Sequence, residues 1–213
     1  AGDKSIEVIQ FDSTLNPAFP RAEYDRMRER MPAWKFDMFY RGRYSRPAGL
    51  IYDCFDTGTM VVAPSAMPPD WSKWPRYTGH DFGGANPAAV FIARNPVTAL
   101  CYVYEEYLPG PGRSTAQHVD EFRRITAGTT VVVRAGGSHQ EEEVREAYRA
   151  HGWQIQEPDL LNVEAGIDRV YGIIKLGLFR VAPHCHNLID ELTSYSRSLD
   201  ANYNPTNEIE DKS

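Results

Sequence analysis

The sequence is poor in cysteine and has no long apolar run. Its 213 residues include three widely spaced cysteines, Cys54, Cys101 and Cys185. This odd number excludes a complete disulfide framework, and the spacing excludes a CxxC metal clip, so a reducing cytoplasm is favoured. No stretch approaches the ~20 apolar residues of a membrane-spanning helix, so no membrane partner is expected. A glycine-rich phosphate loop is also missing, because GPGR at 110–113 lacks a GK[ST] ending, and we expect no ATP hydrolysis by this chain alone.

The composition is otherwise that of a folded protein. Acidic residues number 29 and basic residues 23, which gives a net charge of −6, and 42% of the residues are hydrophobic. These values exclude a disordered chain, a collagen-like fibre and a coiled coil. The acidic balance argues against non-specific coating of nucleic acid but leaves room for a local basic groove. At about 150 residues per domain, the length allows one or two domains.

Proline and hydrophobic periodicity divide the chain. Residues 1–46 contain one expected helix, at 21–30, and four prolines between 64 and 75 indicate a linker or a strap over a surface. Three strands are expected next, from residue 77, over 88–94 and over 99–108. The later expected elements are helices over 118–125, 141–150, 163–176 and 188–199, and strands over 129–133, 153–156 and 179–182. This order predicts an α/β fold with a mixed central sheet and helices on both faces.

Asp81 is the first candidate for chemistry, because it ends an expected strand inside the segment GHDFGG. Acidic residues are depleted in strands, and a buried carboxylate is costly without a partner. Two readings are open. Asp81 either caps the turn through Gly83, or its carboxylate is held there to bind a divalent cation such as Mg²⁺.

Other acidic and histidine side chains also have two readings. Glu141 either reaches a metal or belongs to a solvated acidic helix start, where the helix dipole favours acids. His139 in the loop GGSH either contacts a phosphate or is simply exposed. Of the neighbours Glu105 and Glu106, at most one can face the side of Asp81, and a salt-bridge or solubility role is favoured for the pair. The segment HCH at 184–186 suggests zinc, but without a second pair of ligands it favours a packed cysteine.

Basic residues gather in two places. Arg41, Arg43 and Arg46 alternate with Phe39, Tyr40 and Tyr44, a pattern that suits either DNA-backbone contacts or a domain interface. Further positive charge around Asp81 is expected from Lys73, Arg76 and Arg134.

Several segments, taken in order, carry a family resemblance. They are DFG at 81–83, NPAA at 86–89, YVYEEY at 102–107, HG at 151–152, VEAGIDRVYGIIKLG at 163–177 and HCHNLIDELTSY at 184–195. This succession resembles the nuclease domain of large terminase subunits of tailed bacteriophages. Upstream, NP at 16–17 and YRGRYSRPAGLI at 40–51 resemble the end of the ATPase part of such proteins.

The resemblance implies an RNase H-like fold, with residues 1–50 as the remnant of the ATPase part and linker and residues 51–213 as the nuclease domain. It also implies a hydrolase, an endodeoxyribonuclease that uses two Mg²⁺ or Mn²⁺ ions to cut concatemeric viral DNA during genome packaging. The implied partners are double-stranded DNA, the portal protein, the small terminase subunit and the ATPase domain of the same polypeptide. The implied location is the host cytoplasm, transiently on the viral procapsid.

The family uses three acidic positions, and Asp81 matches the first. The second falls at the end of the fourth strand, where this chain reads VRAGG at 133–137, so Glu141 is the candidate replacement. The third belongs to a C-terminal helix and is expected beyond Ser213. The expected site is therefore Asp81 and Glu141 as catalytic metal ligands, with Arg134, His139, Lys73 and Arg76 at the DNA.

Two other function classes stay open. One is a catalytically weak DNA-guiding or portal-docking module of the packaging motor, which the missing acids favour. The other is a different RNase H-like enzyme such as a junction resolvase, against which the ATPase-like stretch at 1–50 argues. With Asp81 as its one secure acid, the site is expected to bind a first ion weakly and to work better with Mn²⁺ than with Mg²⁺.

Overall fold

The computed structural model describes residues 11–30, 33–43, 49–83, 86–159 and 162–210. By their contacts these residues divide into two compact units, one made of residues 1–53 and 194–213 and the other of residues 54–193. Within the described ranges, no helix is both long and apolar enough to cross a membrane.

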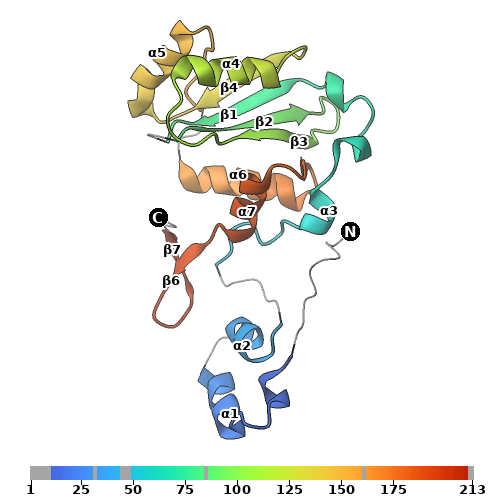
Figure 1. The fold of residues 1–213 in the computed structure, drawn as a ribbon, viewed down its shortest axis with the longest axis vertical. Coiled ribbons are helices and arrows are strands. Elements are labelled where there is room, and N and C mark those ends of the chain that lie inside the picture. Colours follow the sequence, from blue (N-terminus) through green and yellow to red (C-terminus); the bar gives the residue numbers. More distant parts are fainter. Residues whose placement is uncertain (1–10, 31–32, 44–48, 84–85, 160–161, 211–213) are drawn as a thin grey trace. The chain divides into compact units, whose positions relative to one another are not determined.

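The larger unit contains a five-stranded sheet with the strand order β4-β1-β2-β3-β5 (Figure 1). The strands are β1 (Arg76–Asp81), β2 (Ala88–Arg94), β3 (Cys101–Tyr107), β4 (Val131–Gly136) and β5 (Phe179–Val181). Strand β2 runs antiparallel to β1 and β3, whereas β4 is parallel to β1 and β5 is parallel to β3. Strands β1, β3, β4 and β5 therefore all end at one edge of the sheet, which we name the carboxyl edge. The predicted mixed α/β sheet is confirmed, with Asp81 at the end of an interior strand.

Helices cover both faces of this sheet (Figure 1). Helices α4 (Thr115–Ile125) and α5 (Glu142–Ala150) lie on one face, and α6 (Val163–Lys175) and α7 (His186–Ser194) lie on the other. Helix α4 begins at a capping box, in which Ser114 and Gln117 each accept the other's backbone N–H. The short helices of this unit are α3 (Thr57–Met60), η2 (Pro64–Ala66), η3 (Trp71–Lys73) and η4 (His139–Glu141).

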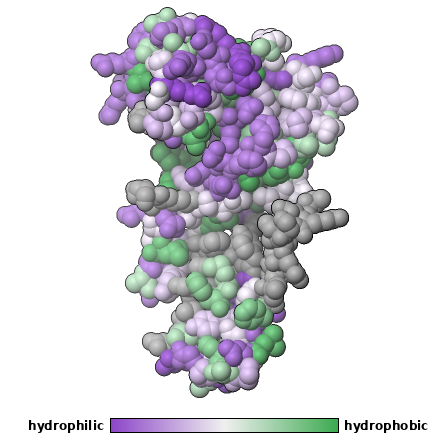
Figure 2. Space-filling view, viewed as in Figure 1, coloured by the Kyte–Doolittle hydropathy of each residue, from purple (hydrophilic) through white to green (hydrophobic). Residues whose placement is uncertain are grey.

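The main core lies between the sheet and α4 and α5, and it is largely aromatic. Phe122 of α4 is its centre, with ring centroids 5.1 Å from Tyr107 and 5.4 Å from Trp153. The buried residues of this cluster are Phe82, Ala89, Phe91, Tyr107, Val119, Phe122, Tyr148, Trp153 and Ile155. The outer surface over α4 and α5 is hydrophilic (Figure 2), so each helix has a polar face towards solvent and an apolar face towards the core.

Strand β1 alternates between this core and the opposite face of the sheet. Thr78 and His80 are buried on the α4/α5 face, where Thr78 Oγ1 lies 2.8 Å from His80 Nε2. Burial lowers the pKa of His80 to about 3, with Arg134 as a second cause, so the imidazole is neutral in the folded protein. Asp81 follows His80 directly and is exposed on the other face.

The smaller unit combines both ends of the chain. It contains η1 (Ser13–Leu15), α1 (Arg21–Arg30), α2 (Ala33–Tyr40), β6 (Arg197–Leu199) and β7 (Pro205–Ile209). Tyr24 and Phe36 pack edge to face with ring centroids 4.9 Å apart and so join α1 to α2. The Ile51 N–H donates to the Tyr195 carbonyl, which ties the incoming chain to the C-terminal segment.

Two expectations about secondary structure were wrong, and one helix was not expected. The helix expected over 188–199 ends at Ser194, and residues 197–199 instead pair with β7 in a hairpin. Its turn is held by Asp200, whose Oδ1 accepts the backbone N–H of Asn202 and of Asn204, each at 2.8 Å. The strand expected over 153–156 is reduced to one bridge, between Gln156 and Ala135. Helix α2 was not expected at all.

The end of β4 leaves no room for a side chain against β1. A Cβ on Gly136 would fall on the His80 carbonyl oxygen and within 2.6 Å of the His80 Cβ. We expect Gly136→Ala to lower the free energy of unfolding by roughly 3 kcal/mol, because both obstructing atoms belong to the neighbouring strand. Urea denaturation would measure the loss. Gly166→Ala, at an open position of α6, is the control and should not destabilise. Equal stability of the two variants would contradict the close packing.

Candidate active site

Polar side chains gather along the carboxyl edge of the sheet. Asp81 ends β1, Glu106 is the penultimate residue of β3, and His184 follows β5. His139 and Glu141 follow β4 in the short helix η4. Because ligands of open α/β sheets bind outside the carboxyl ends of the strands, this edge is the candidate active site.

Asp81 occupies the turn that follows β1. Its Oδ1 accepts the Gly83 N–H at 3.1 Å, so the turn-capping reading is observed. Gly83 has a positive φ of 38°, and a Cβ there would lie 2.8 Å from the Asn86 carbonyl oxygen, so glycine is required. No hydrogen bond or ion pair within the described ranges engages Asp81 Oδ2. The cap fixes the carboxylate and leaves one oxygen for a ligand.

The exposed carboxylate borders a shallow hollow of about 290 Å³. Its lining residues are Gly79, His80, Asp81, Ala88, Ala89 and Val90. A Cβ on Gly79 would approach the Val90 Cγ2 to 3.2 Å. Glycine at this position therefore leaves the hollow beside Val90 free of a further side chain. A phosphate or a hydrated ion can therefore reach Asp81 without displacing a side chain.

Glu106 faces the same side of the sheet as Asp81. Gly79, Val90 and Glu106 are aligned partners across β1, β2 and β3, so their side-chain positions share one face. The Glu106 carboxylate accepts the Asn187 N–H at 3.0 Å and the Leu188 N–H at 2.8 Å, and it thereby caps α7. The backbones of β1 and β3, which are two strands apart, are separated by about 10 Å, and no hydrogen bond among the described residues links Glu106 to Asp81.

Glu141 is engaged at the start of α5. Its Oε2 accepts the Ser138 N–H at 2.6 Å, which completes a capping box. This backbone hydrogen bond holds the pKa of Glu141 below its ordinary value of 4.5, so the carboxylate stays charged. The assignment of Glu141 as a metal ligand stays a prediction.

His139 lies beside a carboxylate that the sequence analysis did not consider. Its side chain is exposed, and its Nδ1 is 3.3 Å from Glu157 Oε1. Glu157 reaches this position because the segment before it runs parallel to β4 through the Ala135–Gln156 bridge. The expected strand at 153–156 was the one signal that could have pointed to it.

Gly136 and Gly137 stand where the resemblance led us to expect a second acid, and neither has room for a side chain. At Gly136, a Cβ would clash with the His80 backbone of β1. Gly137 has a φ of 73°, and a Cβ there would overlap the Phe82 ring, with the Phe82 Cδ2 at 2.7 Å and the Cε2 closer still. An acidic side chain at either position requires a different course of β4.

Two of the expected DNA contacts are turned into the protein. Arg134 pairs with Thr78 on the His80 face, and its guanidinium carbon is 4.4 Å from the centre of the Trp153 ring. Arg76 is buried and donates hydrogen bonds to the carbonyls of Trp71, Ser72 and Trp74. Burial lowers the pKa of both arginines. The structure does not bring either guanidinium to Asp81.

Lys73 is exposed, but it precedes β1, whereas Asp81 ends that strand. The length of β1 alone separates them by about 16 Å. In the smaller unit, Arg41 is paired with Asp37 at 3.0 Å and donates to Tyr24 Oη. Tyr44 and Arg46 lie outside the described residues, as does Gly84 of the GHDFGG segment.

The segment at 184–186 does not assemble a zinc site. His184 Nε2 is 3.3 Å from Glu105 Oε1, Cys185 is fully buried, and His186 begins α7. In the part of the chain that the structure describes, no three His, Cys, Asp or Glu side chains come together to hold a metal. The packed-cysteine reading agrees with this arrangement.

Because no such cluster is present among the described residues, a divalent cation at Asp81 would have few protein ligands. Asp81 Oδ2 is a hard oxygen donor in an accessible position, which suits one Mg²⁺ that completes its shell with water and substrate phosphates. A cage for two ions, by contrast, is not formed by the described side chains. The residues therefore fit a single, substrate-dependent ion.

Solved structures share this arrangement of strands and helices. The nuclease domain of the P22 large terminase superposes with a TM-score of 0.57 at 18% identity, over 76% of this chain and 86% of that one. The fold is that of a terminase nuclease domain. The SPP1 large terminase nuclease domain with bound Mn gives a TM-score of 0.54 at 18% identity, over 71% of this chain and 86% of that domain.

A longer match extends beyond the nuclease domain. The large terminase of a thermophilic bacteriophage gives a TM-score of 0.63 at 15% identity and covers 95% of this chain. This chain spans about half of that protein, 51% of its length. The sequence itself matches no family model and no curated protein.

Burial makes a testable distinction among the three cysteines. Desolvation raises the pKa of the Cys185 thiol to about 12, whereas Cys54 and Cys101 are partly accessible. We expect Cys185 to be unreactive towards a thiol reagent at pH 8 until the protein unfolds, because the thiolate is the reactive form. Mass spectrometry after timed iodoacetamide labelling, with and without urea, measures the order of modification. Labelling of Cys185 before the other two in the folded protein would contradict its burial.

Proposed function

We propose that this chain is the nuclease part of a viral DNA-packaging motor, an endodeoxyribonuclease that cuts concatemeric DNA with a divalent metal ion. The observation that carries the proposal is the exposed Asp81 carboxylate at the end of an interior strand, held by Gly83 with one oxygen left over. The likeness of the fold to terminase nuclease domains supports it, as does the Mn bound in the SPP1 domain.

Asp81 Oδ2 would hold a Mg²⁺ or Mn²⁺ ion at the carboxyl edge. When bound, such an ion polarises a phosphodiester and lowers the pKa of a coordinated water. The chain's own part is positional. Gly83 fixes the carboxylate, neutral His80 anchors the strand in the core, and the low surface at Gly79 admits the DNA backbone. Glu141 is proposed as a second acidic group, which would bind a cation while it still accepts the Ser138 N–H.

The exposed residues of this edge are the proposed DNA contacts. His139 extends from the loop after β4, next to Glu157, where it meets a phosphate only after leaving that carboxylate. Lys73 is exposed at the other end of β1 and would contact the duplex away from the scissile bond. Arg76 and Arg134 contribute through the fold, because both guanidinium groups are used inside it.

The proposal extends to the packaging assembly. Residues 1–50 are proposed as the end of an ATPase part with its linker, and residues 51–213 as the nuclease domain. In support, the match covers 95% of the chain for the large terminase of the thermophilic bacteriophage and 76% for the isolated P22 domain. The proposed partners are double-stranded DNA, the portal protein, the small terminase subunit and the ATPase domain of the same polypeptide. The proposed setting is the host cytoplasm and the viral procapsid.

A second candidate function is a catalytically weak module that guides DNA or docks on the portal. It is favoured by Gly136 and Gly137, which stand where a second acid would be expected and have no space for one. The two functions differ in one measurable property, which is metal-dependent cleavage by the isolated chain.

Asp81→Asn separates the two functions. The amide keeps the oxygen that accepts the Gly83 N–H and removes the charge that binds the cation. We expect plasmid nicking in Mn²⁺ to fall by several orders of magnitude, with an unchanged thermal melt. Nicking by the parent chain should be faster in Mn²⁺ than in Mg²⁺. Equal nicking by parent and variant would show that Asp81 is only a turn cap, and no nicking by the parent would favour the guiding module.

Glu141→Gln tests the second acidic group. Glutamine retains the capping box, since it still accepts the Ser138 N–H, but it carries no charge. We expect nicking to fall by about ten- to a hundredfold, less than for Asp81→Asn, while the melting temperature stays close to that of the parent. Unchanged nicking would restrict Glu141 to its role at the start of α5.

A further inference from the structure

A second cavity lies on the opposite face of the sheet from Asp81, between α4, α5 and the loop that joins β3 to α4. It has a volume of about 320 Å³, within the usual range for small-molecule sites. The residues that line it are Phe82, Pro87, Pro111, Gly112, Arg113, Thr115, His118, Val144 and Tyr148. No step of the proposed cleavage uses this cavity.

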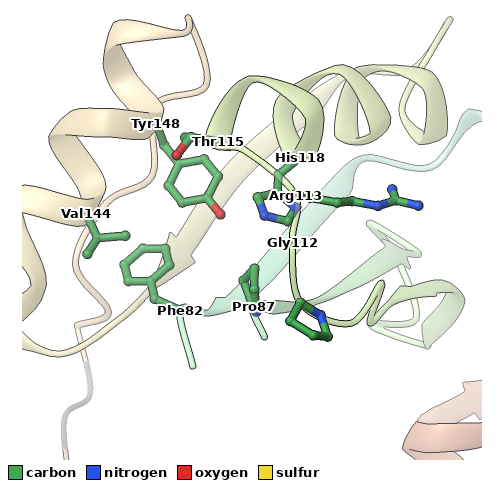
Figure 3. A pocket seen from close by; sticks show the side chains of 9 residues that line it. Phe82, Pro87, Gly112, Arg113, Thr115, His118, Val144 and Tyr148 are labelled. Atoms are coloured by element: carbon green, nitrogen blue, oxygen red, sulfur yellow. The ribbon is translucent and has the colours of Figure 1, made fainter. Parts of the chain in front are cut away.

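Flat rings form its walls. Phe82 and Tyr148 are stacked with centroids 5.5 Å apart and an interplanar angle of 19°. His118 is held in place by Tyr107, whose Oη is 2.8 Å from the His118 Nδ1. Burial and the neighbouring Arg113 lower the pKa of His118, so it contributes a neutral ring. Figure 3 shows these rings around one hollow, with the Arg113 side chain extending away from it.

One polar group faces the cavity without a partner among the described residues. Tyr148 is buried as a residue, with an exposed fraction of 4%, but its hydroxyl oxygen is open to solvent from the cavity. Figure 3 shows this hydroxyl directed into the hollow between Phe82, His118 and Pro87. Burial raises the pKa of Tyr148, so the phenol keeps its proton and is a donor. A donor that faces a cavity can bind a ligand that carries an acceptor.

The cavity adjoins the candidate active site through the backbone of β1. Asp81 and Phe82 are consecutive, and their Cα atoms are about 3.8 Å apart. Asp81 faces one side of the turn, and Phe82 forms a wall of the cavity on the other. Pro87, on the far side of the same turn, is also part of the lining. The two hollows thus lie on the two sides of one turn, and a strand that runs around this turn would meet both.

We propose that this cavity binds a single unstacked nucleobase of the DNA strand whose backbone lies at Asp81. Apolar walls built from rings and prolines, with one donor for a ring nitrogen or carbonyl, match the chemistry of a base. The inference rests on the proposed function for its ligand, and it adds that the strand is locally unpaired at the site. A base held here fixes the register of the backbone next to Asp81.

The test is a binding assay on the full chain in EDTA, so that neither a cation nor cleavage is needed. The probe is a single-stranded oligonucleotide of about 12 nucleotides containing 2-aminopurine, whose fluorescence is quenched on stacking. Val144→Trp fills the cavity from its half-exposed rim and should weaken binding about tenfold. Val97→Trp is the matched control, because Val97 is exposed in the turn between β2 and β3, at the other end of the sheet.

Tyr148→Phe keeps the stacked wall and removes only the donor, so binding should weaken between about two- and tenfold. A fully paired duplex of the same sequence should leave the 2-aminopurine signal unchanged. Thermal melts establish that each variant is folded.

Equal affinity of Val144→Trp and Val97→Trp would overturn the proposal. A deoxynucleoside monophosphate that binds as tightly as the oligonucleotide would also overturn it, because the cavity would then serve a free nucleotide. This outcome is separate from that of the cleavage assay. Quenching that depends on Val144, without any nicking, would support the base site and contradict the nuclease function. Nicking without such quenching would support the nuclease function and contradict the base site.

Discussion

The parallel pairing of β1 with β4 is the constraint on which the site depends. Gly136 lies directly against the His80 backbone, and the Gly137 N–H donates to the His80 carbonyl at 3.2 Å. This contact buries His80 and Thr78 against α4 and α5, and it turns Asp81 outward at the next residue. The same contact excludes side chains from the end of β4. The structure thus presents Asp81 and, by the same packing, withholds an acid from the neighbouring strand.

The carboxyl edge follows from the order of the strands. Strands β1, β3, β4 and β5 point the same way, so residues far apart in the chain lie along this one edge. There they cap helices and turns. Glu106 caps α7, Glu141 completes the capping box of η4, and Asp81 caps its own turn. Each carboxylate thereby has a structural use. Among these three carboxylates, Asp81 is the one that caps a turn and also has an unengaged oxygen at the hollow lined by Gly79 and Val90. The proposed function therefore rests on Asp81.

Much of the fold could be predicted from the sequence, because its hydrophobic pattern is regular where the core is largest. The expected strand over 88–94 and helix over 21–30 have the bounds that the structure shows. The β6–β7 hairpin could not be predicted, since its residues are polar and its turn depends on Asp200. Nor could the pattern tell that Arg76 and Arg134 point inward, because a cation that stacks on Trp153 or binds helix carbonyls looks like a surface charge in the sequence.

The cap on α7 has a mechanical consequence. Helix α7 ends at Ser194, where the chain passes into the smaller unit, and its first turn is bound to Glu106 of β3 by charge-assisted hydrogen bonds. The Glu106 carboxylate therefore anchors the first turn of α7 to the central sheet, and a displacement of this helix along its axis would have to break these hydrogen bonds. The strand that carries Glu106 lies two places from the strand that carries Asp81.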